Sequence, residues 1–251
     1  LRKYNTEFIP VDSEHFSIWY ALKNNSSSNI SKIYLTASGG SLFNIPKNKF
    51  NKLKLSHVLR HPNWKMGKKI TIDSATMMNK VFEIIEAKKI FNLNYNQLGI
   101  IVHPDSYIHA IIKFSDGMIK IIAHDTTMDI PIFNSLYINK EKKIKSNQIN
   151  FNKLNRLKLN KIDYKKYPSV KIIKNLPKND SLFETALVSI NDILVKKFLE
   201  KKINYNDISS KMNKILKNPE INKLKKILPT HFSEVISTNE YIFSKIKSLK
   251  I

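Results

Sequence analysis

The spacing of the apolar residues changes near residue 167, and this change constrains the fold more than any other feature. Before it, short apolar runs alternate with helical patterns, which is typical of an α/β (α+β) domain with a mixed sheet. Ser115-Asp116-Gly117 predicts a hairpin turn between the apolar runs at 107–114 and 118–123. We expect strands at 8–11, 32–37, 69–73, 98–102, 107–114 and 118–123, and helices near 16–22 and 75–91.

Beyond residue 167 the pattern is helical throughout. Helices are expected at 182–200, 206–217 and 232–249, and Ser181 with Glu184 forms a capping box before the first of them. The stretch before residue 167 is rich in Lys and Asn and has weak periodicity, which indicates a linker. The predicted organisation is a catalytic and dimerisation domain at 1–138, a linker at 139–163 and an all-α helical bundle at 164–251.

The chain is strongly basic, with 43 Lys and Arg against 20 Asp and Glu, yet 42% of its residues are hydrophobic. Only Arg2, Arg60 and Arg156 are arginine, whereas the planar arginine fork is favoured for reading bases and clamping phosphates. We therefore expect solvated lysine faces and no specific nucleic-acid partner. A basic protein that associates with RNA stays an alternative. No apolar run is long enough to cross a membrane, so no membrane partner is expected.

Cysteine and glycine usage exclude two kinds of site. The chain has no cysteine, so it has no thiolate metal site, and it suits a reducing compartment. It has only five glycines, so no dinucleotide-binding fingerprint can be written and a nucleotide-binding Rossmann domain is expected elsewhere. Because the chain begins at Leu1 without a targeting segment, we expect it to be the downstream part of a longer reading frame.

Two acids, Asp12 and Glu14, lie two positions apart where the strand candidate at 8–11 ends. If the extended geometry persists, both carboxylates face the same side, and hard oxygen donors at that spacing suit Mg²⁺ or Mn²⁺. The alternative is a helix N-terminus decorated with acids.

A denser cluster follows Asp73. Ser74 is expected at a helix N-cap, where its hydroxyl and the free amides could bind an anion. Asn79, Lys80 and Glu83 follow at helical spacings that place them on neighbouring faces. The lysine and asparagine could then hold phosphate oxygens while the glutamate reaches a cation. The alternative is a capped helix with one salt bridge.

Two loops complete the set of candidates. Ser38-Gly39-Gly40 follows a strand and is typical of a phosphate-accepting turn, because glycines let backbone amides approach an anion. Residues 61–69 join an imidazole, an indole and a thioether without regular period, which suits a lid over a ligand. For the indole, a packing anchor is an equally good interpretation.

Together these motifs resemble the 1-deoxy-D-xylulose 5-phosphate reductoisomerases. The likeness extends over about residues 7–138 and continues in the length and pattern of the linker and helical tail. It implies an enzyme of three parts: an N-terminal domain that binds NADPH, a central catalytic domain that forms a homodimer, and a C-terminal helical domain. This chain resembles the last two parts. The motifs are Pro10-Val11-Asp12-Ser13-Glu14-His15, Ser38-Gly39-Gly40, His61-Pro62-Asn63-Trp64-Lys65-Met66-Gly67, Asp73-Ser74-Ala75-Thr76-Met77-Met78-Asn79-Lys80, Glu83 and His103-Pro104.

The resemblance also implies a role for each matching position. Mg²⁺ or Mn²⁺ would be held by Asp12, Glu14 and Glu83. The catalytic residues would be Glu14, His61, Lys80 and Glu83. The sugar phosphate would be bound by Ser13, Glu14, Ser38, His61, Ser74, Asn79, Lys80 and Glu83. Gly67 would contact the cofactor, and Trp64 and Met66 would form the lid.

The implied reaction is the NADPH- and metal-dependent conversion of 1-deoxy-D-xylulose 5-phosphate to 2-C-methyl-D-erythritol 4-phosphate, an isoprenoid precursor. A bacterial cytoplasm is the expected location, with a plastid as the alternative. The chain departs from the family pattern in places: Val81 replaces a glycine, and Val188-Ser189-Ile190-Asn191-Asp192 stands for Asn-Ala-Ala-Asn-Glu. An inactive remnant that still binds substrate or dimerises is therefore the competing interpretation.

Overall fold

The computed structural model describes residues 6–23, 29–138 and 142–248 and divides into two compact units. The first comprises Leu1–Ser38 and Glu86–Ile162, and the second comprises Gly39–Ile85 and Asp163–Ile251. Each unit is thus built from two separate stretches of chain. Among the described residues, no helix has the length and apolar character needed to cross a membrane.

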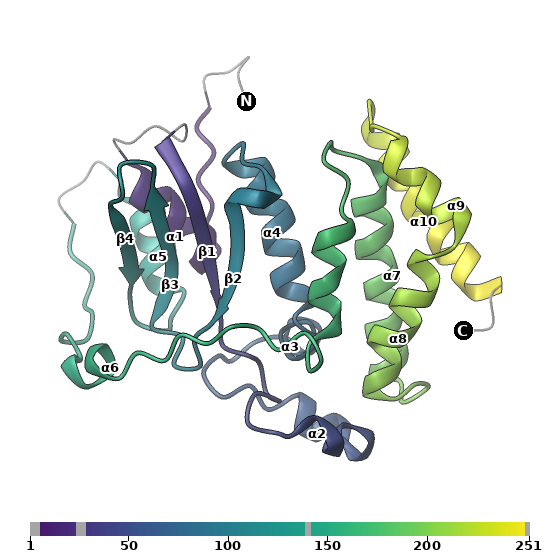
Figure 1. Ribbon diagram of the computed structural model, residues 1–251, viewed down its shortest axis with the longest axis horizontal. Helices are drawn as coiled ribbons and strands as arrows, with labels where there is room; N and C mark the ends of the chain where they lie inside the picture. Colours follow the sequence, from purple (N-terminus) through teal and green to yellow (C-terminus); the bar gives the residue numbers. More distant parts are fainter. Residues whose placement is uncertain (1–5, 24–28, 139–141, 249–251) are drawn as a thin grey trace. The chain divides into compact units, whose positions relative to one another are not determined.

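The first unit contains a four-stranded mixed sheet (Figure 1). Its strands are β1 (Ile30–Ala37), β2 (Leu98–Val102), β3 (Ile108–Phe114) and β4 (Ile119–Ala123), in the order β2-β1-β3-β4. Strand β1 runs parallel to β2 and antiparallel to β3, and β3 pairs antiparallel with β4. The predicted mixed sheet is confirmed.

The core of this unit lies between the sheet and helix α1 (Ser13–Leu22), which packs against β3. Its largest fully buried side chains are aliphatic, and burying each one stabilises the fold by ~1.5–3 kcal/mol. They include Ile18, Ile33, Leu35, Ile108 and Ile112. The predicted hairpin joins β3 to β4: Gly117 has φ +91°, and the Met118 amide donates to the Asp116 carboxylate at 2.9 Å. Helix α5 (Asp129–Leu136) follows β4.

The second unit is mainly helical. Helix α7 (Leu182–Leu199) packs against α8 (Tyr205–Leu216) and α10 (Phe232–Ser248), as Figure 1 shows. The expected helices are confirmed, although residue 249 of the last prediction lies outside the described residues. The capping box is also confirmed, because the Phe183 amide donates to Ser181 Oγ at 3.2 Å and the Ser181 amide donates to Glu184 Oε2 at 3.1 Å. The shorter elements of this unit are η3 (Lys47–Lys52), α2 (Leu55–Val58), η5 (Pro168–Asn175), α9 (Pro219–Lys223) and η6 (Leu224–Lys226).

Two predicted strands are wrong. Residues 8–11 have no regular structure, because this stretch pairs with no strand of the sheet and Pro10 lacks an amide donor. Residues 69–73 lie in helix α3 (Lys68–Thr76). A short apolar run cannot by its period be told from a buried helix segment, and here burial of Thr71, Ile72 and Asp73 overrides the β-branched preference for strand.

The predicted linker is only partly irregular. Its residues 139–141 lie outside the described residues, but 151–155 form helix α6 (Phe151–Asn155). Further on, the amides and carbonyls of Val102 and Asn160 exchange two hydrogen bonds of 2.8 Å, so the linker attaches to the end of β2. Each compact unit combines two stretches that are separate in the chain. The predicted boundaries of the functional domains, at residues 138 and 164, stay a prediction.

Candidate metal centre

Asp12 begins helix α1 and does not end a strand. Its side-chain oxygen accepts the amides of Glu14 and His15, at 3.1 and 3.3 Å, which is the bonding of an N-cap. The extended geometry expected for Asp12 and Glu14 is therefore wrong, and the alternative of a helix N-terminus decorated with acids is correct. The two acids nevertheless share one end of the helix.

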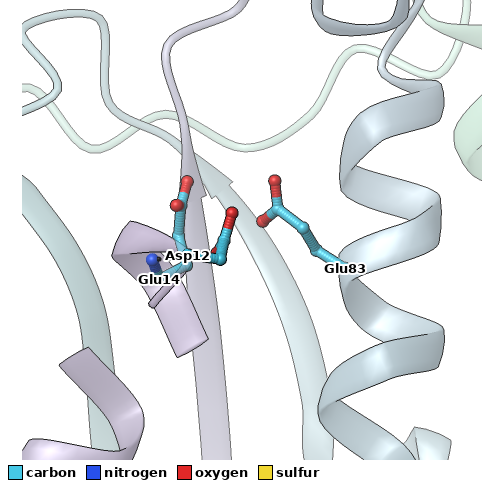
Figure 2. Close-up of side chains that lie close together, drawn as sticks. All are labelled: Asp12, Glu14 and Glu83. Carbon is cyan, nitrogen blue, oxygen red and sulfur yellow. Dashed lines mark hydrogen bonds between the residues drawn. The ribbon is translucent and has the colours of Figure 1, made fainter. Parts of the chain in front are cut away.

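The three predicted metal ligands lie together. Asp12, Glu14 and Glu83 each offer one carboxylate oxygen, and these oxygens all lie within 4.8 Å of one another. Figure 2 shows the first two reaching from the start of α1 and the third from helix α4. The first two are half-buried, and the Glu83 side chain is only 3% exposed.

Helix α4 (Met78–Ile90) carries Glu83 and continues across the division between the two units, which falls between Ile85 and Glu86. One turn after Glu83, a Glu86 oxygen lies 3.7 Å from His15 Nδ1, and the same nitrogen lies 3.3 Å from Asp12 Oδ1. The buried imidazole thus joins the start of α1 to the last turns of α4.

Both oxygens of Glu83 have partners on their own helix. Asn79 Nδ2 donates to Oε1 at 2.5 Å, and Lys80 Nζ donates to Oε2 at 2.5 Å. Lys80 is 5% exposed, so this is a buried ion pair. Burial of an unpaired carboxylate is costly, and the lysine offsets that cost. The predicted helical spacing is confirmed. The salt bridge that the alternative interpretation expected on this helix is also present, between Lys80 and Glu83.

The charge of the cluster favours a cation. Three carboxylates and the Lys80 ammonium leave an excess of negative charge, and the oxygens are hard donors of the kind that Mg²⁺ and Mn²⁺ prefer. The buried Ser13 hydroxyl donates to Glu14 Oε2 at 2.5 Å and holds that side chain at the start of α1.

Ser74 is not an N-cap. Gly67 occupies that position for α3, and Ser74 lies in the last turn, which ends where Met77 takes a left-handed φ of +62°. The structure does bring the glycine turn against this helix: a Cβ added to Gly40 would lie 2.7 Å from Ala75 Cα and 2.8 Å from the Ser74 carbonyl oxygen. Only glycine allows this approach.

The proposed lid is an irregular segment between α2 and α3. The His61 Nδ1 atom accepts the amides of Asn63 and Trp64, at 3.2 and 3.0 Å, so the neutral ring carries its proton on Nε2. Burial lowers the pKa of His61, which favours that neutral form. Trp64 and Met66 are half-buried, and Gly67 is exposed. Closure of this segment over a ligand stays a prediction.

Sequence reasoning missed one polar contact of the second unit. Asn191 in α7 donates to Asp73 in α3 at 2.7 Å, and both side chains are buried. Nothing in the local spacing signals a pair separated by 118 positions. The only hint was that Asn191 belongs to the segment that departs from the family pattern.

The mixed sheet, the clustered carboxylates and the buried lysine define an α/β protein suited to hold a divalent cation. Two family models match the chain. One is the 1-deoxy-D-xylulose 5-phosphate reductoisomerase C-terminal domain, over residues 8–91, and the other is the DXP reductoisomerase C-terminal domain, over residues 125–241. The chain belongs to the 1-deoxy-D-xylulose 5-phosphate reductoisomerase family.

Individual relatives support the same family assignment. The reductoisomerase of Pelagibacter ubique is 57% identical over 251 residues, which is 100% of this chain and 65% of the relative, and that of Sulfurihydrogenibium is 36% identical over 87% of this chain and 58% of the relative. The Zymomonas mobilis reductoisomerase, solved with NADPH, gives a TM-score of 0.86 at 28% identity over 99% of this chain and 63% of that one. A further reductoisomerase structure, with NADPH, fosmidomycin and magnesium, gives 0.84 at 29% identity over 99% and 65%. The chain spans less than two thirds of the length of these relatives.

Proposed function

We propose that this chain is the metal- and substrate-binding part of a 1-deoxy-D-xylulose 5-phosphate reductoisomerase, acting with NADPH and Mg²⁺ or Mn²⁺. The observation that carries the proposal is the cluster of Asp12, Glu14 and Glu83, whose oxygens lie within 4.8 Å of one another. Relatives over the whole chain carry the same name, and one solved relative contains NADPH and magnesium.

The donor set fits the metal. Asp12, Glu14 and Glu83 would hold it through oxygens, and a divalent cation there would stabilise negative charge developing on a carbonyl oxygen of the sugar phosphate. The Asp12 carboxylate is already oriented by two helix amides, and Glu14 is oriented by Ser13. Such preorganisation means that few side chains need to be ordered when the ion binds.

The phosphate would be held by Ser38, Ser74, Asn79 and Lys80. The approach of Gly40 to the Ser74 carbonyl oxygen supports this proposal, because it draws the glycine turn to the helix that carries Ser74. Asn79 and Lys80 donate to Glu83 in the structure, so they would have to turn, or share their protons, to reach a phosphate. Fixing the remote phosphate would align the reacting carbons.

The lid segment would exclude water and place a hydrogen-bond donor. His61 carries its proton on Nε2, on the ring edge opposite the nitrogen that accepts the loop amides, and would donate a hydrogen bond through it to an oxygen of the substrate. Trp64 and Met66 would cover the sugar. Gly67, exposed and with nothing within 4 Å of an added Cβ, leaves room for a cofactor. NADPH itself would be held mainly by the part of the reductoisomerase relatives that this chain does not match.

A homodimer is part of the proposal. Strand β4 is an edge of the sheet, and its side chains Ile119 and Ile121 are 55% and 50% exposed, with Met118 beside them at 66%. An exposed apolar edge strand is a ready site for pairing with another chain. Ile121→Lys should turn a dimer into a monomer in light scattering. The predicted bacterial cytoplasmic location stays a prediction.

The activity is tested with a chimera. The N-terminal part of the Pelagibacter ubique reductoisomerase, which is 57% identical over the matched region, is joined ahead of Leu1. We expect this chimera to oxidise NADPH when 1-deoxy-D-xylulose 5-phosphate and Mn²⁺ are present, and the same chimera with Glu83→Gln to be inactive. A folded chimera that binds Mn²⁺ but oxidises no NADPH would favour the inactive remnant.

A further inference from the structure

A buried polar cluster joins α3 to α7 within the second unit and takes no part in the chemistry proposed above. Asp73 of α3 is 2% exposed, and both its oxygens are held. Asn191 Nδ2 of α7 donates to Oδ1 at 2.7 Å, and Lys69 Nζ of α3 donates to Oδ2 at 2.9 Å. The same Lys69 nitrogen forms an ion pair of 3.0 Å with Asp192 of α7.

Burial and the polar partners act in opposite directions on the pKa values of Asp73 and Lys69. Burial raises the pKa of Asp73, while the hydrogen bonds from Asn191 and Lys69 act against that rise. Burial alone would lower the pKa of Lys69, but Asp73 and Asp192 raise it overall. A carboxylate this deep is kept charged by its donors, so removing either one leaves a buried charge without its full set of partners.

The position of the cluster on α3 connects it to the proposed site. Gly67 of the lid segment is the N-cap of this helix, and Ser74 directly follows Asp73. Lys69 and Asp73 lie one turn apart on this nine-residue helix, so their contacts with Asn191 and Asp192 would hold its rotation. Tyr205 of α8 adds a second tie, because its hydroxyl donates to the Ala75 carbonyl at 2.7 Å.

We propose that Asn191 and Asp192 of α7 are positioning residues for substrate binding: by holding Asp73 and Lys69 they set the orientation of Ser74 and of the base of the lid. The inference rests on the proposed function. It assigns a role to the segment that stands for the family's Asn-Ala-Ala-Asn-Glu pattern. The two positions that keep an amide and an acid are those that contact α3, whereas Val188, in place of the first asparagine, is 42% exposed.

The test uses the full chain and calorimetric titration of 1-deoxy-D-xylulose 5-phosphate in the presence of Mn²⁺. Asn191→Leu keeps the shape of the side chain and removes the donor. We expect sugar-phosphate affinity to fall by about tenfold or more, since a small misplacement of a positioning helix is costly. The affinity for Mn²⁺ without the sugar phosphate should be unchanged, because no ligand of the metal lies on α3 or α7.

Two further variants separate positioning from simple destabilisation. Leu194→Ala removes a fully buried side chain one turn along α7 and should lower the melting temperature while leaving sugar-phosphate affinity intact. The exchange Asp73→Asn with Asn191→Asp restores an amide–carboxylate pair and should recover part of the lost affinity. Equal losses in Asn191→Leu and Leu194→Ala, or no loss in Asn191→Leu, would overturn the inference. A parent chain that binds no sugar phosphate at all would instead contradict the proposed function.

Discussion

Lys80 and Glu83 form a buried ion pair on one face of α4, with Nζ 2.5 Å from Oε2. The same glutamate is one of the three carboxylates that cluster at the candidate metal centre. Lys80 thus competes with a metal ion for the Glu83 carboxylate. In the proposed function, Lys80 also binds the phosphate of the substrate. Binding of a phosphate that drew Lys80 away would release Glu83 for the cation, so the two ligands would bind with positive coupling.

Replacement of Lys80 should separate these two roles. Lys80→Met removes the competing charge, so Mn²⁺ should bind more tightly without phosphate, on the order of tenfold. The same change should abolish the tightening that sugar phosphate produces in the parent chain. Calorimetric titration of Mn²⁺, with and without the sugar phosphate, measures both effects. Lys89→Met, an exposed position on the same helix, is the control for loss of a positive charge. Weaker Mn²⁺ binding in Lys80→Met would contradict the competition.

The contact of Gly40 with α3 predicts a large loss of stability on substitution. Gly40→Ala forces a side chain into a left-handed φ of +67° and against the Ala75 backbone at 2.7 Å. The backbone strain alone costs ~1–2 kcal/mol, and the overlap adds to it. Gly117→Ala is the matched control, because its φ is +91° but an added Cβ meets nothing within 4 Å. Urea unfolding should show a clearly larger loss for Gly40→Ala, and equal losses would argue against a tight approach.

The His124 ring predicts a pH dependence of stability. It stacks on the His109 ring, with the two centroids 3.7 Å apart. Burial lowers the pKa of His124, although its hydrogen bond to the Asp125 carbonyl acts the other way. A lowered pKa means that the unfolded chain binds more protons, so the stabilisation present above the unfolded pKa is lost as the pH falls through the folded value.

His124→Gln should therefore reduce the loss of stability between about pH 7.5 and about pH 5.5. Melting temperatures across that interval measure the effect. His231→Gln, at an exposed position before α10, should leave the pH profile as it is in the parent chain. A profile for His124→Gln that superimposes on that of the parent chain would contradict the expectation.

Periodic features of the fold could be predicted from the sequence. The α7 helix, with its Ser181 and Glu184 cap, and the hairpin at Gly117 follow from local patterns that the structure reproduces. Residues 69–73 could not be assigned correctly, because a run this short shows no period that separates a strand from a partly buried helix segment. The N-cap assigned to Ser74 failed with it, since the break between α3 and α4 depends on Met77 adopting a left-handed φ.

For the candidate site, the residue types were predictable and some of their geometry was not. Asp12, Glu14 and Glu83 do come together, although the first two reach the cluster from a helix start and not from a strand. The Asn191–Asp73 contact was out of reach, because it depends on the packing of two helices far apart in the chain.

A titration of Mn²⁺ into the chain tests the central claim most directly. We expect one ion to bind per chain, and Glu83→Gln to weaken that binding by at least about tenfold, because a neutral amide replaces a carboxylate ligand. Glu86→Gln makes the same change of charge one turn away and outside the cluster, so it should bind Mn²⁺ almost as the parent does. Equal affinity in the parent chain and in Glu83→Gln would show that the three acids do not share an ion.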